Sequence, residues 1–110
     1  MRVNFDFDNT LTTGDCRYWI DGEREEPDER GCALATEAYH SGHTLIIWTA
    51  RPWSEANVIA ARLTEWGVPY HGIRCEKGSS DIYVDDKAVN VDNVPADTQI
   101  DEVLAEVRNA

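Results

Sequence analysis

The chain has 110 residues, a length near that of a single domain, and enough Ile, Leu, Val, Trp and Tyr for one hydrophobic core. No apolar run approaches the ~20 residues that span a bilayer, and the N-terminus lacks the apolar region of a signal peptide. We therefore expect one cytoplasmic domain without membrane contact. The three cysteines (Cys16, Cys32 and Cys75) have no close metal-type spacing and are interpreted as reduced thiols.

Acidic residues dominate the charge balance: 21 Asp and Glu stand against 10 Lys and Arg, and the formal net charge is -11. Such a surface repels itself in dilute salt, but the screening length falls from ~10 Å at 0.1 M to ~3 Å at 1 M salt. The only lysines are Lys77 and Lys87. This composition is typical of a halophilic organism, although an acidic mesophilic protein is the alternative. The charge also argues against a basic nucleic-acid footprint.

The first part of the chain predicts a strand, a loop and a helix. Apolar residues Val3 to Phe5 indicate a short buried strand. The polar segment 13–27 is rich in turn residues and indicates a loop or short hairpin, in which residues 23–26 form a solvated charged face. A helix is expected from near Asp28 to His40, followed by Gly42. The inner side of this helix consists of Leu34, Ala35, Ala38 and Tyr39.

A second strand and a second helix follow. Residues 45–48 are apolar and indicate a strand. Within the segment 54–66, apolar residues recur at i, i+3, i+4 and i+7, and Gly67 comes directly after it, which indicates a helix. A weaker strand is expected at 70–75. The periodic apolar positions of the helix are Ala56, Ile59, Ala60 and Leu63.

The last part predicts a strand at Ile82-Tyr83-Val84 and a helix that starts near Thr98. Thr98 and Asp101 resemble a capping box at the start of this helix. The apolar residues on one face of the helix are Ile100, Val103, Leu104 and Val107. Strands that alternate with helices predict an α/β fold: a Rossmann-like, mostly parallel sheet with helices on both faces, in a single domain.

Polar residues follow three of the predicted strands. Asp6 stands at the carboxyl end of the first strand, where open α/β sheets place their ligand sites, and Asp8 lies on the loop beyond it. The second strand ends in Thr49-Ala50-Arg51 and the last one in Asp85-Asp86-Lys87. Paired acids can hold a divalent cation and divide nucleophilic and proton-transfer work between them. An isolated pair can equally be a solvated turn at the end of a strand.

In this order the motifs resemble those of the haloacid dehalogenase-like (HAD) superfamily of phosphohydrolases. Asp6-Phe7-Asp8-Asn9-Thr10-Leu11-Thr12 is similar to the first motif, Thr49 to the second, Lys77 to the third and Asp85-Asp86 to the fourth. Asn9 departs from the family, which often has Gly there, but Asn also accepts left-handed backbone angles. The gaps between motifs are too short for a cap domain. We therefore expect an open site, unless the 13–27 loop or a second subunit covers it.

The resemblance implies a Mg²⁺-dependent phosphomonoester hydrolase. Asp6 would attack phosphorus and form an aspartyl phosphate, and Asp8 would protonate the leaving oxygen and then activate water. Thr49 and Lys77 would contact phosphoryl oxygens. The ligands implied for Mg²⁺ are Asp6, the backbone carbonyl of Asp8, Asp85 and, through water, Asp86.

Several side chains keep two interpretations. Arg51 can bind a phosphate or another substrate anion, or it can pair with a surface acid. Lys87 is the alternative to Lys77 as the cation of the site. Trp53, Tyr18 and Trp19 can stack on a base or sugar, or they can serve in packing.

The function also has alternatives. The same Asp6 chemistry fits a phosphotransferase, which passes the phosphoryl group to an alcohol instead of water. A phosphate-binding or metal-binding module without catalysis is a second alternative. A two-component receiver domain fits less well, because its acid pair and phosphoacceptor Asp follow other strands. For the phosphohydrolase that the resemblance implies, the substrate would be a small phosphorylated molecule or a phosphorylated macromolecule, and the sequence does not separate these classes.

Overall fold

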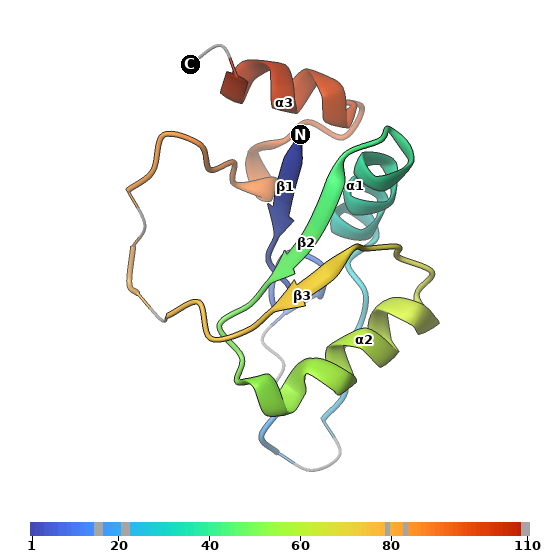
Figure 1. Cartoon of the computed structure of the whole chain (residues 1–110), viewed down its shortest axis with the longest axis vertical. Helices are drawn as coiled ribbons and strands as arrows, with labels where there is room; N and C mark the ends of the chain where they lie inside the picture. The colour runs from blue at the N-terminus through green and yellow to red at the C-terminus, as the bar shows by residue number, and fades with distance from the viewer. Residues whose placement is uncertain (15–16, 21–22, 79, 83, 109–110) are drawn as a thin grey trace.

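Three parallel strands form the centre of the computed structural model, which describes residues 1–14, 17–20, 23–78, 80–82 and 84–108 (Figure 1). β1 (Arg2–Phe5) pairs with β2 (Thr44–Trp48), and β2 pairs with β3 (Gly72–Arg74). In this register Phe5 lies beside Ile47. The three strands expected in the first 75 residues are therefore present, and the sheet is parallel as predicted.

Helices connect and follow the strands. α1 (Glu29–His40) links β1 to β2, and the 3₁₀ helix η1 (Trp53–Glu55) leads into α2 (Ala56–Glu65), which links β2 to β3. The short η2 (Val91–Asn93) and α3 (Ile100–Arg108) complete the described chain. The alternation of strands and helices confirms the α/β class. Every helix in the described ranges is too short or too polar to cross a membrane.

The hydrophobic core lies on one face of the sheet. Leu45 and Ile47 of β2 point into it, whereas Thr44 and Trp48 on the opposite face are exposed. The core cluster also contains Leu34, Ala35 and Ala38 of α1, Ile59 and Leu63 of α2, and Ile100 and Leu104 of α3. All three helices therefore pack on the same side of the strands.

This arrangement differs from the expected cover on both faces. A crossover between parallel strands is right-handed in nearly all proteins. The strand order β1-β2-β3 moves in one direction, so both crossover helices are placed on the same face. Helices on both faces need a strand order that reverses, and the described strands have no reversal. Among the described elements, no helix covers the second face of the sheet, on which Thr44 and Trp48 are exposed.

Contacts with α1 determine where α3 begins. The backbone amide of Ile100 donates a hydrogen bond to Glu37 Oε1 of α1 (2.9 Å). Arg30 of α1 donates from Nη1 to the carbonyl of Ala96 (2.8 Å). The expected start near Thr98 was therefore two residues early, and a carboxylate from another helix binds the first helical amide. The side chain of Val107 lies outside the described part of the structure.

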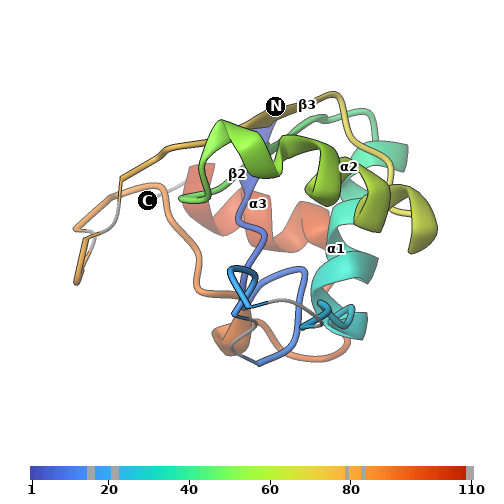
Figure 2. The same cartoon turned by 90° about the horizontal axis from the view of Figure 1, so that it is seen from below.

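The prediction of a strand at residues 82–84 was wrong for the described residues. Ile82 and Val84 are 76% and 96% exposed and lie in a segment that projects from the body of the domain (Figures 1 and 2). Tyr83 lies outside the described residues. A run of three apolar residues offers few ladder hydrogen bonds, and acids at Asp81 and Asp85 flank it. Apolar composition alone was insufficient to pair this segment with the sheet.

The expected loop after the first motif is closed like a short hairpin. Thr12 and Pro27 form an isolated antiparallel bridge, and the amide of Thr13 donates to the carbonyl of Glu26 (2.9 Å). Cys16 lies outside the described residues. The two ends of the loop are thus held together beside the end of β1.

Candidate active site

The backbone turns sharply directly after β1. The carbonyl of Phe7 accepts hydrogen bonds from the amides of Leu11 (2.9 Å) and Thr12 (3.1 Å). Asn9 has a φ of 60°, in the left-handed region, and its amide donates to Thr12 Oγ1 (3.0 Å). The expectation that Asn9 accepts left-handed angles is confirmed. This turn carries Asp8 on a short, hydrogen-bonded loop.

The start of α1 fits closely against this turn. Asp28 caps the helix, because its Oδ2 accepts from the amide of Gly31 (2.7 Å). A Cβ atom at position 31 would lie 1.7 Å from the carbonyl oxygen of Thr10, so only glycine permits this contact. Cys32 donates its thiol to the carbonyl of Leu11 (3.4 Å). Burial, assisted by the charge of Asp28, raises the pKa of Cys32 to about 11, which agrees with an unreactive thiol.

Asp6 and Lys77 form an ion pair at the carboxyl end of β1. Lys77 Nζ lies 3.1 Å from Asp6 Oδ2, and Lys77 is the more buried partner. The other carboxylate oxygen, Oδ1, accepts from the amide of Phe7 (2.8 Å). The amide of Lys77 donates to the carbonyl of Thr49 (3.1 Å), so the loop after β3 is tied to the end of β2. Of the two candidate lysines, Lys77 is the one that meets Asp6.

Asp8 is held by Arg51 through a two-pronged contact. Arg51 Nε donates to Asp8 Oδ2 (2.9 Å), and Nη2 donates to Oδ1 (2.7 Å). This fork fixes both the position and the plane of the carboxylate. Asp8 remains partly exposed, while the Arg51 side chain is 1% exposed. The carboxylate of Asp8 is thus presented to solvent from a rigid, buried support.

Arg51 lies at the centre of a buried cluster. Its Nη1 donates to Glu25 Oε2 (2.7 Å) and to Glu55 Oε1 (3.3 Å). Its guanidinium carbon lies 5.1 Å from the ring centroid of Phe7 and 4.2 Å from that of Tyr18. Burial opposes the guanidinium charge, but hydrogen bonds and charges from Asp8 and Glu25 outweigh it and raise the pKa of Arg51. The donors of Arg51 are used on carboxylates rather than left for a substrate anion.

Glu25 corrects the prediction that residues 23–26 form a solvated face. Its side chain is 4% exposed and also accepts from Arg62 Nε of α2 (3.0 Å). Burial favours the neutral acid, but backbone hydrogen bonding together with Arg51 and Arg62 outweighs it and lowers the pKa of Glu25. The loop therefore packs onto Arg51 through Glu25 and Tyr18. Nothing in the local sequence separates Glu25 from its exposed neighbours, so sequence reasoning missed it.

Thr49 is buried directly after β2. Its Oγ1 accepts from the amide of Arg51 (3.1 Å), and its own amide donates to the carbonyl of Arg74 (2.9 Å). The side chain thus holds the turn at the end of β2 in this structure. The expected contact between Thr49 and a phosphoryl oxygen stays a prediction.

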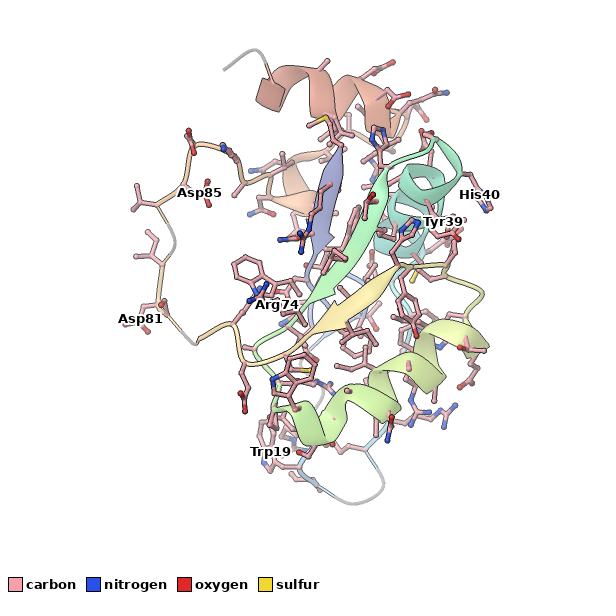
Figure 3. All side chains as sticks on the ribbon, viewed as in Figure 1. Trp19, Tyr39, His40, Arg74, Asp81 and Asp85 are labelled. Carbon is pink, nitrogen blue, oxygen red and sulfur yellow. The ribbon has the colours of Figure 1, made fainter. Side chains whose placement is uncertain are left out.

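Asp85 and Asp86 are not brought to Asp6. Both are exposed on the projecting segment, and Asp85 Oδ1 accepts from the amide of Lys87 (2.7 Å). Figure 3 shows Asp85 away from the strands, on the same projecting segment as Asp81. Within the described ranges, no group of three His, Cys, Asp or Glu residues is placed to hold a metal ion. The donor set implied for Mg²⁺ is not assembled in this arrangement.

The chain shares its fold with a Vibrio cholerae protein. The crystal structure of that protein, described only as an MCSG target, superposes with a TM-score of 0.72. The likeness covers 99% of this chain and 98% of that chain, at 24% sequence identity. No family model matches the chain, and no curated protein matches it significantly. The comparison supports the α/β fold over nearly the whole length.

Proposed function

We propose that the protein is a phosphoric monoester hydrolase that works through an aspartyl phosphate on Asp6. The observation that carries this proposal is the Asp6–Lys77 pair at the end of β1, with Asp8 held two residues later. A partly exposed carboxylate beside an ammonium group is suited to attack an anionic phosphate, because the cation offsets like-charge repulsion. The motif order of the HAD superfamily supports the same assignment.

The residues of this chain divide the reaction into two steps. First, an Asp6 oxygen bonds to phosphorus while the ester P–O bond breaks, and protonated Asp8 gives its proton to the departing alcohol. Next, water attacks phosphorus and transfers a proton to Asp8, and Asp6 is released with inorganic phosphate. Lys77 neutralises charge on a phosphoryl oxygen in both steps. Arg51 positions Asp8 and does not itself contact the substrate.

Magnesium stays a prediction of the family resemblance. The four acids proposed as its site are not gathered in the described structure, and the two steps above use only side chains of this chain. Its role is tested directly by measuring phosphate release from one preparation with added Mg²⁺ and with a chelator. Release that falls to background with the chelator and returns with Mg²⁺ supports the assignment. Equal rates in both conditions would remove it.

The nucleophile is tested with p-nitrophenyl phosphate and the variant Asp6→Asn. We expect turnover to fall by about 10³ or more, because the amide is a poor nucleophile. Asp97→Asn is the matched control, since Asp97 is an exposed acid of the same size and should keep wild-type turnover. Wild-type turnover in Asp6→Asn would show that the nucleophile lies elsewhere.

The variant Asp8→Asn distinguishes the general acid and base Asp8 from the nucleophile Asp6. Loss of a general acid and base typically costs ~10² to 10⁴ in rate, and an alkyl phosphate should suffer more than an aryl phosphate. The aryl ester should still phosphorylate Asp6, giving a burst of p-nitrophenolate before a slow steady state. Mass spectrometry of the quenched variant should find phosphate on the peptide with Asp6. Equal losses for both esters, with no burst, would make Asp8 a structural residue.

A further inference from the structure

The open face of the sheet carries a groove next to the proposed site. Its volume is about 440 Å³, within the range of roughly 300 to 1,000 Å³ typical of small-molecule pockets. It is lined by side chains from all three strands and from the segments that follow β2 and β3: Arg2, Asn4, Ile46, Trp48, Trp53, Arg74, Cys75, Glu76 and Lys77. The face is open because all three helices pack on the other side.

The charge of this groove is opposite to that of the molecule. Three of the ten basic residues, Arg2, Arg74 and Lys77, line it, and Glu76 is the only acid among the described residues that line it, although the chain has 21 acids. Among the described carboxylates, none lies within ion-pair distance of Arg2 or Arg74. Figure 3 shows Arg74 beside the ends of β2 and β3, on the side of the projecting segment. A positive groove on an acidic protein selects anions.

Two tryptophans give the groove flat apolar surface. Trp48 at the end of β2 and Trp53 at the start of η1 are 38% and 53% exposed. Lys77 Nζ lies 5.2 Å from the ring centroid of Trp48. Exposed indole rings beside cations are the elements with which proteins stack nucleobases and hold their phosphates.

Lys77 joins the groove to the catalytic carboxylate. The same ammonium group that pairs with Asp6 also lines the groove and lies over Trp48. A phosphate in contact with Asp6 and Lys77 therefore lies at one end of the groove, from which the alcohol part of the substrate can extend into it. The alcohol is then in reach of the indole rings and of Arg74.

We infer that the groove binds the nucleoside part of a nucleoside monophosphate. This inference rests on the proposed hydrolysis at Asp6. The base stacks on tryptophan, and the arginines donate to acceptor atoms on its edge, the contact that arginine makes with guanine O6 and N7. A sugar phosphate without a base makes the same phosphate contacts but does not contact the indole rings. The groove thus selects a flat, acceptor-rich leaving group.

The test compares guanosine 5′-monophosphate with ribose 5-phosphate, which has the same sugar and phosphate without the base. We expect kcat/KM to be about tenfold to a hundredfold higher for the nucleotide, as stacking on one aromatic ring typically gives. Trp53→Ala should remove most of this advantage and leave ribose 5-phosphate unchanged. Trp19→Ala is the control, because Trp19 is an exposed tryptophan outside the groove and should leave the ratio intact.

A binding measurement separates this inference from the proposed function. Titration calorimetry of the wild-type protein with guanosine 5′-monophosphate and ribose 5-phosphate reports the preference even if no phosphate is released. If the protein releases phosphate from p-nitrophenyl phosphate but has equal kcat/KM and equal affinity for the two ligands, the groove assignment is overturned. The proposed hydrolysis at Asp6 is not affected by that result. A single-stranded oligonucleotide that binds far more tightly than the mononucleotide would also overturn the groove assignment. So would a dimer in sedimentation that Trp53→Ala converts to monomer.

Discussion

Buried Arg51 and the exposed pair Arg2 and Arg74 differ in what surrounds them. Arg51 is buried between Phe7 and Tyr18 and donates to three carboxylates. Arg2 and Arg74 line an open groove with tryptophans and have no ion pair with a described carboxylate. Burial makes the first guanidinium a support for Asp8, and exposure leaves the other two solvated, as the inferred ligand contacts require.

The comparison shows that an excess of acids does not decide which arginine is paired. Removing a charge from water is costly, so a buried guanidinium persists only with several well-placed partners. An exposed guanidinium is solvated and needs none, and an exposed pair typically contributes only about 0 to 1 kcal/mol. Geometry near the core, rather than the net charge of -11, therefore sets the pairing.

Removing Arg51 and Arg74 in turn tests the difference between buried and exposed arginines most directly. Arg51→Met leaves Asp8, Glu25 and Glu55 facing one another without their cation, and we expect the free energy of unfolding to fall by about 3–5 kcal/mol. Arg74→Met should change it by less than about 0.5 kcal/mol. Urea titration followed by circular dichroism measures both. Equal losses in the two variants would mean that burial does not distinguish them.

Substituting Gly31 tests whether the backbone contact between α1 and the turn after β1 supports Asp8. Gly31→Ala places a Cβ atom 1.7 Å from the carbonyl oxygen of Thr10, a backbone atom that cannot move alone. We expect a loss of about 1–3 kcal/mol in stability and reduced phosphatase turnover, because the turn that holds Asp8 is displaced. At Gly72 the nearest atom is Ile46 Cδ1 at 3.4 Å, so Gly72→Ala should be tolerated. A neutral Gly31→Ala would show that α1 does not hold this turn.

Acid sensitivity should separate the buried cluster from the exposed acids. The pKa of Glu25 is lower in the folded protein than its ordinary value of 4.5, so its stabilising contribution is present above that value. The contribution is lost as the pH falls through the lowered folded pKa. The stability difference between wild type and Glu25→Gln should therefore shrink as the pH is lowered from about 6 to about 3. Thermal melts at each pH measure it, and a constant difference would contradict the assignment.

Salt should act on the exposed charges and leave the buried cluster nearly unchanged. Because the net charge is -11, the thermal midpoint should rise between ~0.1 M and ~2 M KCl as self-repulsion is screened. The deficit of Arg51→Met relative to wild type should stay nearly constant over this range, since buried pairs are screened much less. A midpoint that does not respond to salt would remove the halophilic interpretation of the composition.

Patterns of apolar residues within short stretches of the chain were sufficient to predict much of the fold. Apolar runs and helical periods predicted β1, β2, α1 and α2, because each pattern repeats within a few residues and each element buries one side. The same reasoning failed at residues 82–84, where an apolar run has no partner strand in the described structure. A strand depends on a partner strand that can be distant in the sequence, so its presence is not decided locally.

The sequence by itself determined the positions of Asp6 and Asp8 after the first strand and the left-handed turn at Asn9, since these depend on residues adjacent in the chain. Tertiary structure alone decided that Glu25 is buried on Arg51 and that one face of the sheet is open. Both outcomes depend on which elements meet in space. A side chain's charge is visible in the sequence, but its exposure to water is a property of the whole packed chain.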